Sequence, residues 1–106
     1  MSTLRLGPLH VDLVSGDIAP GAGRLTEIEG RLIAYLASRA GEVVTHEELL
    51  REVWGYADGV RTRTVYSTVN RLRNKIEEDP SAPRFLRTEP QRGYRLVLGV
   101  EPAAVG

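Results

Sequence analysis

Two copies of one helix-start signal constrain the fold of this chain more than any other feature. Thr26 is followed three positions later by Glu29, and Thr45 is followed three positions later by Glu48. In this arrangement, called a capping box, the hydroxyl accepts a hydrogen bond from the N–H of the third residue. The acidic side chain reaches back to the N–H of the threonine. We therefore expect one helix to begin after Thr26 and another after Thr45.

Apolar residues recur at helical spacing behind each threonine. Gly41 and Gly55 follow these two runs, and glycine suits the left-handed residue beyond a helix end. Val44 precedes the second cap, where an apolar residue can pack on the following turn. The predicted core stripes are Ile28, Leu32, Ile33 and Leu36, with Tyr35 beside them, in the first helix, and Leu49, Leu50, Val53 and Trp54 in the second.

A third helix is expected over residues 62–78. Thr62 is a suitable N-cap, and Pro80 in "DPSAP" breaks the pattern after the helix end. On a helical wheel one narrow seam is apolar, and such a seam packs against the rest of a domain. The seam consists of Val65, Val69, Leu72 and Ile76.

Strands are expected on both sides of the helices. Residues 1–25 alternate between apolar and polar positions among turn-forming residues, which favours short antiparallel strands over a disordered leader. Residues 84–100 contain "RFLRT" and "YRLVLGV" joined by "EPQRG", which is the pattern of a β-hairpin. With a three-helix core over residues 26–79, the order predicts an α+β fold. A chain of 106 residues is long enough for one core, so we expect a single domain over residues 1–106.

Charge is unevenly distributed along this chain, whose formal net charge is zero. Residues 1–60 hold five arginines against nine acids, whereas residues 61–106 hold nine cations against five acids. The segment Arg61–Lys75 alone contains five cations and no acid. This asymmetry indicates one face suited to a polyanion.

The face of the third helix opposite its apolar seam carries side chains that can recognise DNA bases. In a major groove arginine pairs with guanine, asparagine with adenine and serine with either, while flanking cations reach phosphates. A solvated helix face usually mixes charges of both signs, so we favour duplex DNA over that alternative. The outward face has Arg63, Ser67, Asn70 and Asn74, flanked by Tyr66 and Arg71, with Arg73 and Lys75 nearer the seam.

The predicted hairpin is basic as well. Beside a groove-reading helix it could serve as a wing on a phosphate strand or in the adjacent minor groove, and an ordinary polar hairpin is the alternative. The rival function is a protein–protein module whose basic helix binds an acidic partner. RNA fits less well because the A-form major groove is too narrow for a helix. The hairpin cations are Arg84, Arg87, Arg92 and Arg95, against the single acid Glu89.

Other classes of function lack support in the sequence. There is no cysteine, and His10 and His46 stand apart from each other and from any carboxylates at metal-ligand spacing. No glycine begins a phosphate-binding loop. We therefore expect no enzymatic activity, no cofactor and no metal. No apolar run approaches the roughly 18 residues that cross a bilayer, and no signal peptide is apparent. We expect a cytoplasmic location without membrane contact.

The ordered motifs "LTEIEGRLIAYLASRAGEVVTHEELLREVWG", "RTVYSTVNRLRNKIEEDPSAPRFLRT" and "GYRL" resemble the winged helix-turn-helix DNA-binding domain of OmpR/PhoB-type response regulators, over about residues 4–98. The resemblance implies an N-terminal four-stranded antiparallel sheet, three helices and a C-terminal β-hairpin wing. It also implies that helix 62–78 enters the major groove and that wing 84–98 meets the minor groove or the backbone. Two-component regulators of this type control transcription, and they typically bind directly repeated half-sites as dimers.

The resemblance also implies roles for individual residues. Arg63 matches the first arginine of the family's recognition helix. Base reading is expected from Arg63, Ser67, Asn70, Arg71 and Asn74. Contacts to the DNA backbone, or from the wing, are expected from Trp54, Thr64, Tyr66, Arg73, Lys75, Thr88 and Arg92. Arg73 also matches a mainly structural position of the family, as do Leu72, Gly93 and Tyr94. The loop expected to face RNA polymerase consists of Gly55, Tyr56, Ala57, Asp58, Gly59 and Val60.

Three departures from the family pattern matter. Tyr66 and Thr68 stand where the family commonly has aspartate and histidine, and Pro90 stands where the wing usually has its minor-groove arginine, so we expect Arg92 to substitute for it. The strand segment before Leu25 is shorter than usual, so we expect the four-stranded sheet to lose a strand or to have one trimmed. The chain has no room for a receiver domain. We therefore expect a receiver or another regulatory domain in the same protein or in another chain.

Overall fold

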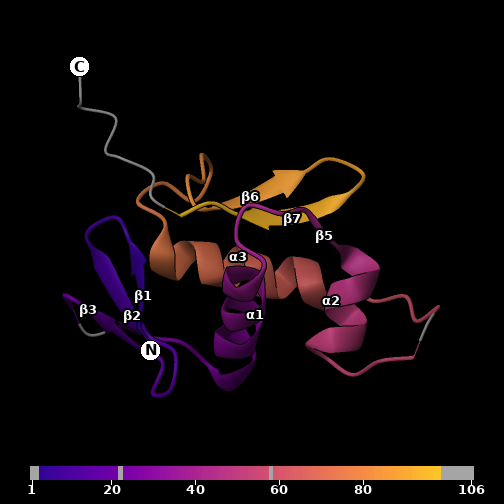
Figure 1. The fold of residues 1–106 in the computed structure, drawn as a ribbon, viewed down its shortest axis with the longest axis horizontal. Coiled ribbons are helices and arrows are strands. Elements are labelled where there is room, and N and C mark those ends of the chain that lie inside the picture. The colour runs from indigo at the N-terminus through magenta and orange to yellow at the C-terminus, as the bar shows by residue number, and fades with distance from the viewer. Residues whose placement is uncertain (1–2, 22, 58, 99–106) are drawn as a thin grey trace.

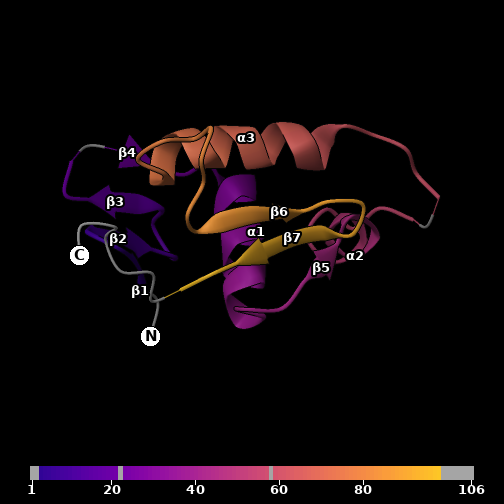
Figure 2. The same ribbon diagram turned by 90° about the horizontal axis from the view of Figure 1, so that it is seen from above.

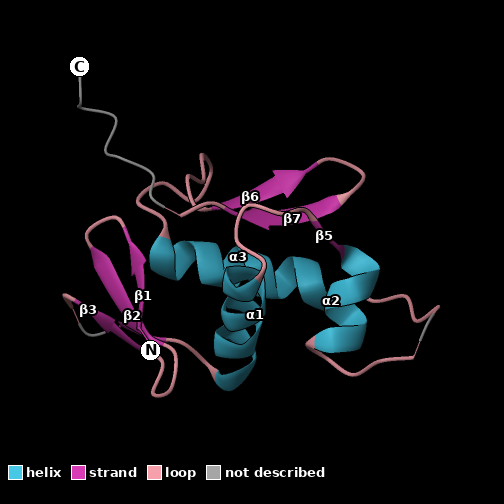
Figure 3. Ribbon diagram, in the orientation of Figure 1, coloured by secondary structure: helices cyan, strands magenta, loops and turns pink. Residues whose placement is uncertain are grey.

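The computed structural model describes residues 3–21, 23–57 and 59–98. A four-stranded sheet lies at one end, three helices fill the middle and a smaller sheet covers one side of the third helix (Figures 1 and 3). The predicted α+β fold is confirmed. The elements are β1 (Thr3–Leu6), β2 (Leu9–Asp12), β3 (Asp17–Ala19), β4 (Gly23–Arg24), α1 (Glu27–Ser38), β5 (Val44–Thr45), α2 (His46–Glu52), α3 (Thr64–Ile76), β6 (Leu86–Glu89) and β7 (Gly93–Leu96).

The N-terminal strands form an antiparallel sheet in the order β1-β2-β3-β4. Alternate residues point into the core, so Leu4 pairs with Val11, Val11 pairs with Ile18, and all three are buried. This one-sided burial is what period-two alternation predicts. The expected trimming is also present, because β4 has only two residues, Gly23–Arg24.

The first capping box is fully formed. The N–H of Glu29 donates to the Thr26 Oγ1 at 3.3 Å, and the N–H of Thr26 donates to the Glu29 Oε1 at 2.9 Å. Leu32, Ile33 and Leu36 are completely buried on the predicted stripe. The sequence signal therefore fixes both where α1 begins and which face it turns inward.

The second capping box is only half formed, which corrects the prediction. The N–H of Glu48 donates to Thr45 Oγ1 at 3.1 Å, but the Glu48 carboxylate turns to α1. There it accepts hydrogen bonds from the Tyr35 hydroxyl and, at 2.5 Å, from the Arg39 guanidinium. A phenol and a cation outcompete one backbone N–H for this carboxylate. The bond from Tyr35 lowers the pKa of Glu48.

The third helix is shorter than residues 62–78, and Thr62 is not its N-cap. Arg63 holds the cap position without a side-chain bond, while Thr62 Oγ1 accepts a hydrogen bond from the N–H of Thr64 at 3.2 Å. At the other end Glu77 leaves the helix in an extended conformation. Its buried carboxylate accepts hydrogen bonds from three backbone N–H groups, those of Arg84 at 2.7 Å, Phe85 at 3.0 Å and Leu86 at 2.8 Å.

The expected hairpin is the major part of a three-stranded sheet in the order β5-β7-β6. The two-residue strand β5 was not predicted. In it, Val44 pairs with Tyr94 and Thr45 with Gly93. A Cβ on Gly93 would overlap the Val44 carbonyl and lie 2.8 Å from the Thr45 Cα, so this close approach requires glycine. Residues 99 and 100 of the predicted hairpin lie outside the described residues.

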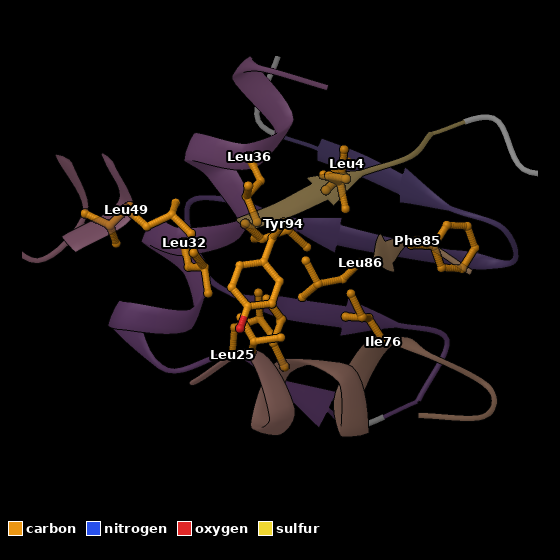
Figure 4. Close-up of a cluster of buried hydrophobic side chains, with 14 of the residues drawn as sticks. Leu4, Leu25, Leu32, Leu36, Leu49, Ile76, Phe85, Leu86 and Tyr94 are labelled. Carbon is orange, nitrogen blue, oxygen red and sulfur yellow. The ribbon is translucent and has the colours of Figure 1, made fainter. Parts of the chain in front are cut away.

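One apolar core joins all these parts. Figure 4 shows Leu4 from the N-terminal sheet, Leu32 and Leu36 from α1, Leu49 from α2, and Leu86 and Tyr94 from the C-terminal sheet converging with Ile76 of α3. In the part of the chain that is described, no helix is long and apolar enough to traverse a membrane.

Candidate nucleic-acid interface

The seam of α3 is buried as predicted, and this orients the remaining faces of the helix. Val65, Val69 and Leu72 are completely buried, and Ile76 is nearly so. In both views α3 runs across α1, and in Figure 2 it lies along the outer edge of the molecule. The face opposite the seam is therefore available to a partner, and the two flanks of the helix meet different neighbours.

The available face carries the predicted base-reading residues at its centre. Arg63 and Asn74 are exposed, while Ser67 and Asn70 are half-buried. The Arg63 guanidinium lies 5.1 Å from the centre of the Tyr66 ring, within the range of a cation–π interaction. Tyr66 is about half exposed (49%), so this pair presents a flat, cationic surface at the start of the helix. The Asn74 amide donates one hydrogen bond to the Asn70 carbonyl at 2.9 Å.

Arg73 fastens one flank of α3 to the wing, here defined as β6, β7 and the turn between them. Its Nε donates to the Leu86 carbonyl at 2.9 Å, and its Nη2 donates to the Thr88 hydroxyl at 2.7 Å. The guanidinium also lies 5.9 Å from the Tyr94 ring centre. Burial raises the pKa of Tyr94 despite this nearby cation. Arg73 is expected at the DNA backbone, and in the structure its Nε and Nη2 bind the wing.

Lys75 fastens the opposite flank of α3 to α1 and β4. Its Nζ donates to Glu29 Oε1 at 2.6 Å and to the Arg24 carbonyl at 2.9 Å. On the same flank the Arg71 Nε lies 3.6 Å from Glu29 Oε2. Glu29 is completely buried, which raises its pKa, but the bonds from Lys75 and from the Thr26 N–H outweigh burial and the net pKa is lowered. Lys75 is also expected at the DNA backbone, and in the structure its Nζ binds Glu29 and the Arg24 carbonyl.

The arginines of the wing differ in how far their side chains are already bound within the protein. The Arg95 Nε is paired with Glu89 Oε2 at 3.2 Å, and the Arg87 Nε donates to the Arg84 carbonyl at 3.1 Å. Arg92 is exposed in the turn that follows Pro90, where the neighbouring Gln91 adopts a left-handed conformation with φ of 64°. The N–H of Arg92 donates to the Glu89 carbonyl at 2.9 Å and closes this turn. Arg92 is thus the arginine carried at the wing tip.

The remaining predicted contacts lie around α2 and the start of α3. Trp54 is half-buried and packs against the core, Thr64 is half-buried in the first turn of α3, and Thr88 is exposed on β6. Of the loop expected to face RNA polymerase, Gly55, Tyr56, Ala57, Gly59 and Val60 are all exposed, and Asp58 lies outside the described residues. Residues of this loop and of α2 line an open cavity of about 510 Å³.

Two acids hold α3 to its neighbours, and the sequence did not predict this role for either of them. Glu29 was recognised only as a capping residue, and no partner was predicted for Glu77, which lies within the helix expected over residues 62–78. A buried acid needs hydrogen bonds or a cation, and its partners here are far along the chain or in the backbone. The cation-rich stripe of Arg71 and Lys75, four residues apart, was the one local signal that an acid should face this flank.

Solved structures with the same fold come from several bacteria. The structure of the response regulator DrrB of Thermotoga maritima, an OmpR/PhoB homologue, matches with a TM-score of 0.76 and 31% identity over 91% of this chain, which spans 44% of DrrB. The DNA-binding domain of CpxR from E. coli matches with a TM-score of 0.74 and 25% identity, covering 92% of this chain and 97% of that one. The RstA DNA-binding domain of Klebsiella pneumoniae, solved in complex with the RstA box, has a TM-score of 0.77 at 23% identity, covering 92% of this chain and 98% of that one.

A family model assigns the chain directly. Residues 21–96 match the model described as "Transcriptional regulatory protein, C terminal". These residues contain all three helices and the wing, and they make up more than half of the 106 residues. The resemblance to OmpR/PhoB-type domains is thereby confirmed. The chain belongs to the family of C-terminal domains of transcriptional regulatory proteins.

Proposed function

We propose that this chain binds duplex DNA with a sequence preference, with α3 in the major groove. The observation that carries the proposal is the division of the α3 surface. Its seam is buried in the core, one flank is fastened to the wing and the other to α1, and the one face left open carries arginine, serine and asparagine without an acid. The relative from Klebsiella pneumoniae was solved on its DNA box, which supports the same use of the fold.

Base reading is assigned to the open face. Arg63 is the leading reader, because its long side chain stands at the start of the helix and can make two parallel bonds to guanine. Ser67, Asn70 and Asn74 follow on the same face and set the preference at neighbouring positions. Their short side chains reach base edges only if the helix lies deep in the groove, which the absence of acids on this face allows.

Contacts to the DNA backbone are assigned to residues beside that face. Thr64 and Tyr66 lie in the first turn of α3, Trp54 precedes the loop, and Thr88 stands on the wing. Arg92 at the wing tip takes the place of the family's minor-groove arginine. Arg73 and Lys75 are assigned mainly to holding α3 in position. Arg73 binds Leu86 and Thr88, and Lys75 binds Glu29 and Arg24. Each keeps further donors for the phosphate contact expected from the sequence.

The family assignment extends the proposal to regulation. We propose that the chain is the output domain of a cytoplasmic transcription regulator, controlled by a receiver or other regulatory domain. Because DrrB is more than twice as long as the matched segment, such a domain fits a longer protein. The loop of residues 55–60 is assigned to RNA polymerase, with Tyr56 (40% exposed) and Val60 (42% exposed) as its apolar contacts. A dimer on repeated half-sites completes the proposed assembly.

The function is tested by selecting binding sites from a random duplex library and titrating them by fluorescence anisotropy at two salt concentrations. We expect an enriched motif and an affinity that falls steeply with salt, by about one log–log slope unit per phosphate neutralised. No binding at low salt would overturn the proposal. It would favour the alternative in which the basic helix binds an acidic protein.

Arg63→Ala tests the leading base contact. We expect it to weaken binding to the enriched site by about 1–3 kcal/mol and to relax the preference at one position. The measurement is the affinity for the enriched duplex and for single-base variants of it. An equal loss on a scrambled duplex would show that Arg63 contacts only phosphate.

A further inference from the structure

Glu29 is an acid in a place where an acid should hinder a DNA-binding domain. It is completely buried at the start of α1 and sits against the flank of α3. Burying a carboxylate is unfavourable unless cations and hydrogen bonds compensate. A negative charge next to a groove-reading helix also repels phosphates. Glu29 thus carries a desolvation cost and repels DNA, and it does not lie on the open face. Its presence at this position therefore needs a structural explanation.

The reason lies in how Arg71 is held. Its Nε lies 3.6 Å from Glu29 Oε2, and its Nη2 donates to Thr68 Oγ1 at 3.2 Å. Thr68 is itself fixed, because its hydroxyl donates to the Thr64 carbonyl at 2.7 Å. Glu29 cannot shift easily, since its other oxygen accepts hydrogen bonds from Lys75 and from the Thr26 N–H. Arg71 is therefore anchored at two atoms while its side chain remains 57% exposed.

We propose that Glu29 positions Arg71 to contact one DNA phosphate at the groove edge opposite the wing. This inference rests on the proposed DNA binding and changes the role assigned to Arg71 from base reading to phosphate contact. A guanidinium has five N–H donors, so two can face the protein while others face a phosphate oxygen. Glu29 Oε2 is buried and has no hydrogen bond among the described residues, and the Arg71 guanidinium is the cation that faces it. If Arg71 reached away to a base, this oxygen would lose that contact, and only the other oxygen would keep its bond to Lys75.

The wing and the α1 flank would then each offer one contact to the DNA backbone, on opposite sides of the open face. On the wing side, Arg73 of α3 holds Thr88. On the α1 side, Glu29 holds Arg71. Ordering a long side chain in advance removes part of the entropy cost of binding. The buried acid thus favours DNA binding through its effect on one arginine, although its own charge opposes it.

This role predicts the opposite sign from simple electrostatics, which makes it testable. Glu29→Gln removes one negative charge near the DNA, so long-range attraction alone would strengthen binding. If Glu29 positions Arg71, the same change weakens binding about two- to tenfold, the range for ordering one long side chain. Glu27→Gln is the matched control, because Glu27 is exposed in the same first turn of α1 and the charge change is identical.

The experiment compares Glu29→Gln, Glu27→Gln, Arg71→Ala and the Glu29→Gln/Arg71→Ala double variant on the enriched duplex and on a scrambled one. We expect Glu29→Gln to weaken both complexes equally and to reduce the salt slope by about one. We expect Glu27→Gln to bind as tightly as the unmodified chain or more tightly. In the Arg71→Ala background, Glu29→Gln should cause no further loss. Circular dichroism melts establish that each variant is folded at the assay temperature.

A second variant covers the case in which Glu29→Gln does not fold. Arg71→Lys keeps the charge and leaves Glu29 intact, but it replaces the planar guanidinium, whose donors are spread over three nitrogens, with a compact point charge that cannot reach Thr68, Glu29 and a phosphate in the same geometry. We expect it to lose most of the affinity that Arg71→Ala loses, on both duplexes. Full affinity of Arg71→Lys, tighter binding by Glu29→Gln, or a loss confined to the enriched duplex would each overturn the inference. Failure of DNA binding as a whole is a different result, because the unmodified chain would then bind neither duplex.

Discussion

The two flanks of α3 are fastened by different chemistry. On the α1 flank, cations of the helix meet the side chain of one buried acid, Glu29. On the wing flank, Arg73 and Glu77 bind mostly backbone groups of residues 84–86. An attachment between two side chains can be broken from either partner and depends on charge. An attachment between a side chain and the backbone can be removed by mutation only at the side chain. It does not depend on which side chains the bound strand carries.

The largest effect is expected from breaking the α1 flank. Lys75→Met keeps the apolar stem but leaves the buried Glu29 without its closest cation. Removing one partner of a fully buried pair costs about 3–5 kcal/mol. Since Lys75 is about one third exposed, we expect the free energy of unfolding to fall by about 2–3 kcal/mol in urea titrations. Arg31→Met, at an exposed position of α1, is the control and should change it by less than about 0.5 kcal/mol. If Lys75→Met lost as little stability as Arg31→Met, the buried Glu29 would not depend on Lys75.

A smaller effect is expected on the wing flank. Glu77→Gln keeps one oxygen acceptor but removes the charge that three backbone N–H groups share, so we expect a loss of about 1–2 kcal/mol. The neighbouring Glu78 is exposed, and Glu78→Gln is the control, with little change in stability. Hydrogen exchange at the amides of residues 84–86 should quicken in the first variant alone. Unchanged exchange there would mean that the sheet pairing, and not Glu77, holds the start of the wing.

The smallest effect sharpens the comparison through pH. The folded-state pKa of Glu29 lies below its ordinary value of 4.5, so the folded state binds fewer protons than the unfolded chain. Its stabilisation is present above that ordinary pKa and is lost as pH falls through the lower folded-state value. In urea titrations from about pH 6 to pH 3, Glu29→Gln should therefore show a shallower loss of stability than the unmodified chain. Parallel curves would assign the acid sensitivity to other carboxyls, such as Glu48.

Sequence patterns predicted the parts of this fold that depend on neighbours along the chain. The seam of α3 and the first capping box follow from spacings of three and four residues, and both are confirmed. The open face with Arg63 and Asn74 followed from the same wheel, because burying the seam fixes where the opposite residues point. The base-reading roles themselves stay predictions.

The parts that could not be predicted depend on partners that folding brings together. Glu48 left its expected capping bond because Tyr35 and Arg39 arrive from α1. Glu29 gained its ion pair from Lys75, which is far away in the sequence. The same reason explains β5, since two residues carry no alternation and form a strand only because β7 lies beside them.

Gly93 has a mechanical consequence for the wing. Its missing side chain lets β7 press against the backbone of Val44 and Thr45, which immediately precede α2. The wing is therefore held next to its tip and not at its base, because Gly93 directly follows Arg92 and its strand partner Thr45 directly precedes α2. A displacement of the tip would therefore be passed on to Val44 and Thr45, the residues that connect to the start of α2. A side chain at position 93 would loosen this attachment immediately beside Arg92, and would therefore change the position of the wing arginine that is assigned to DNA.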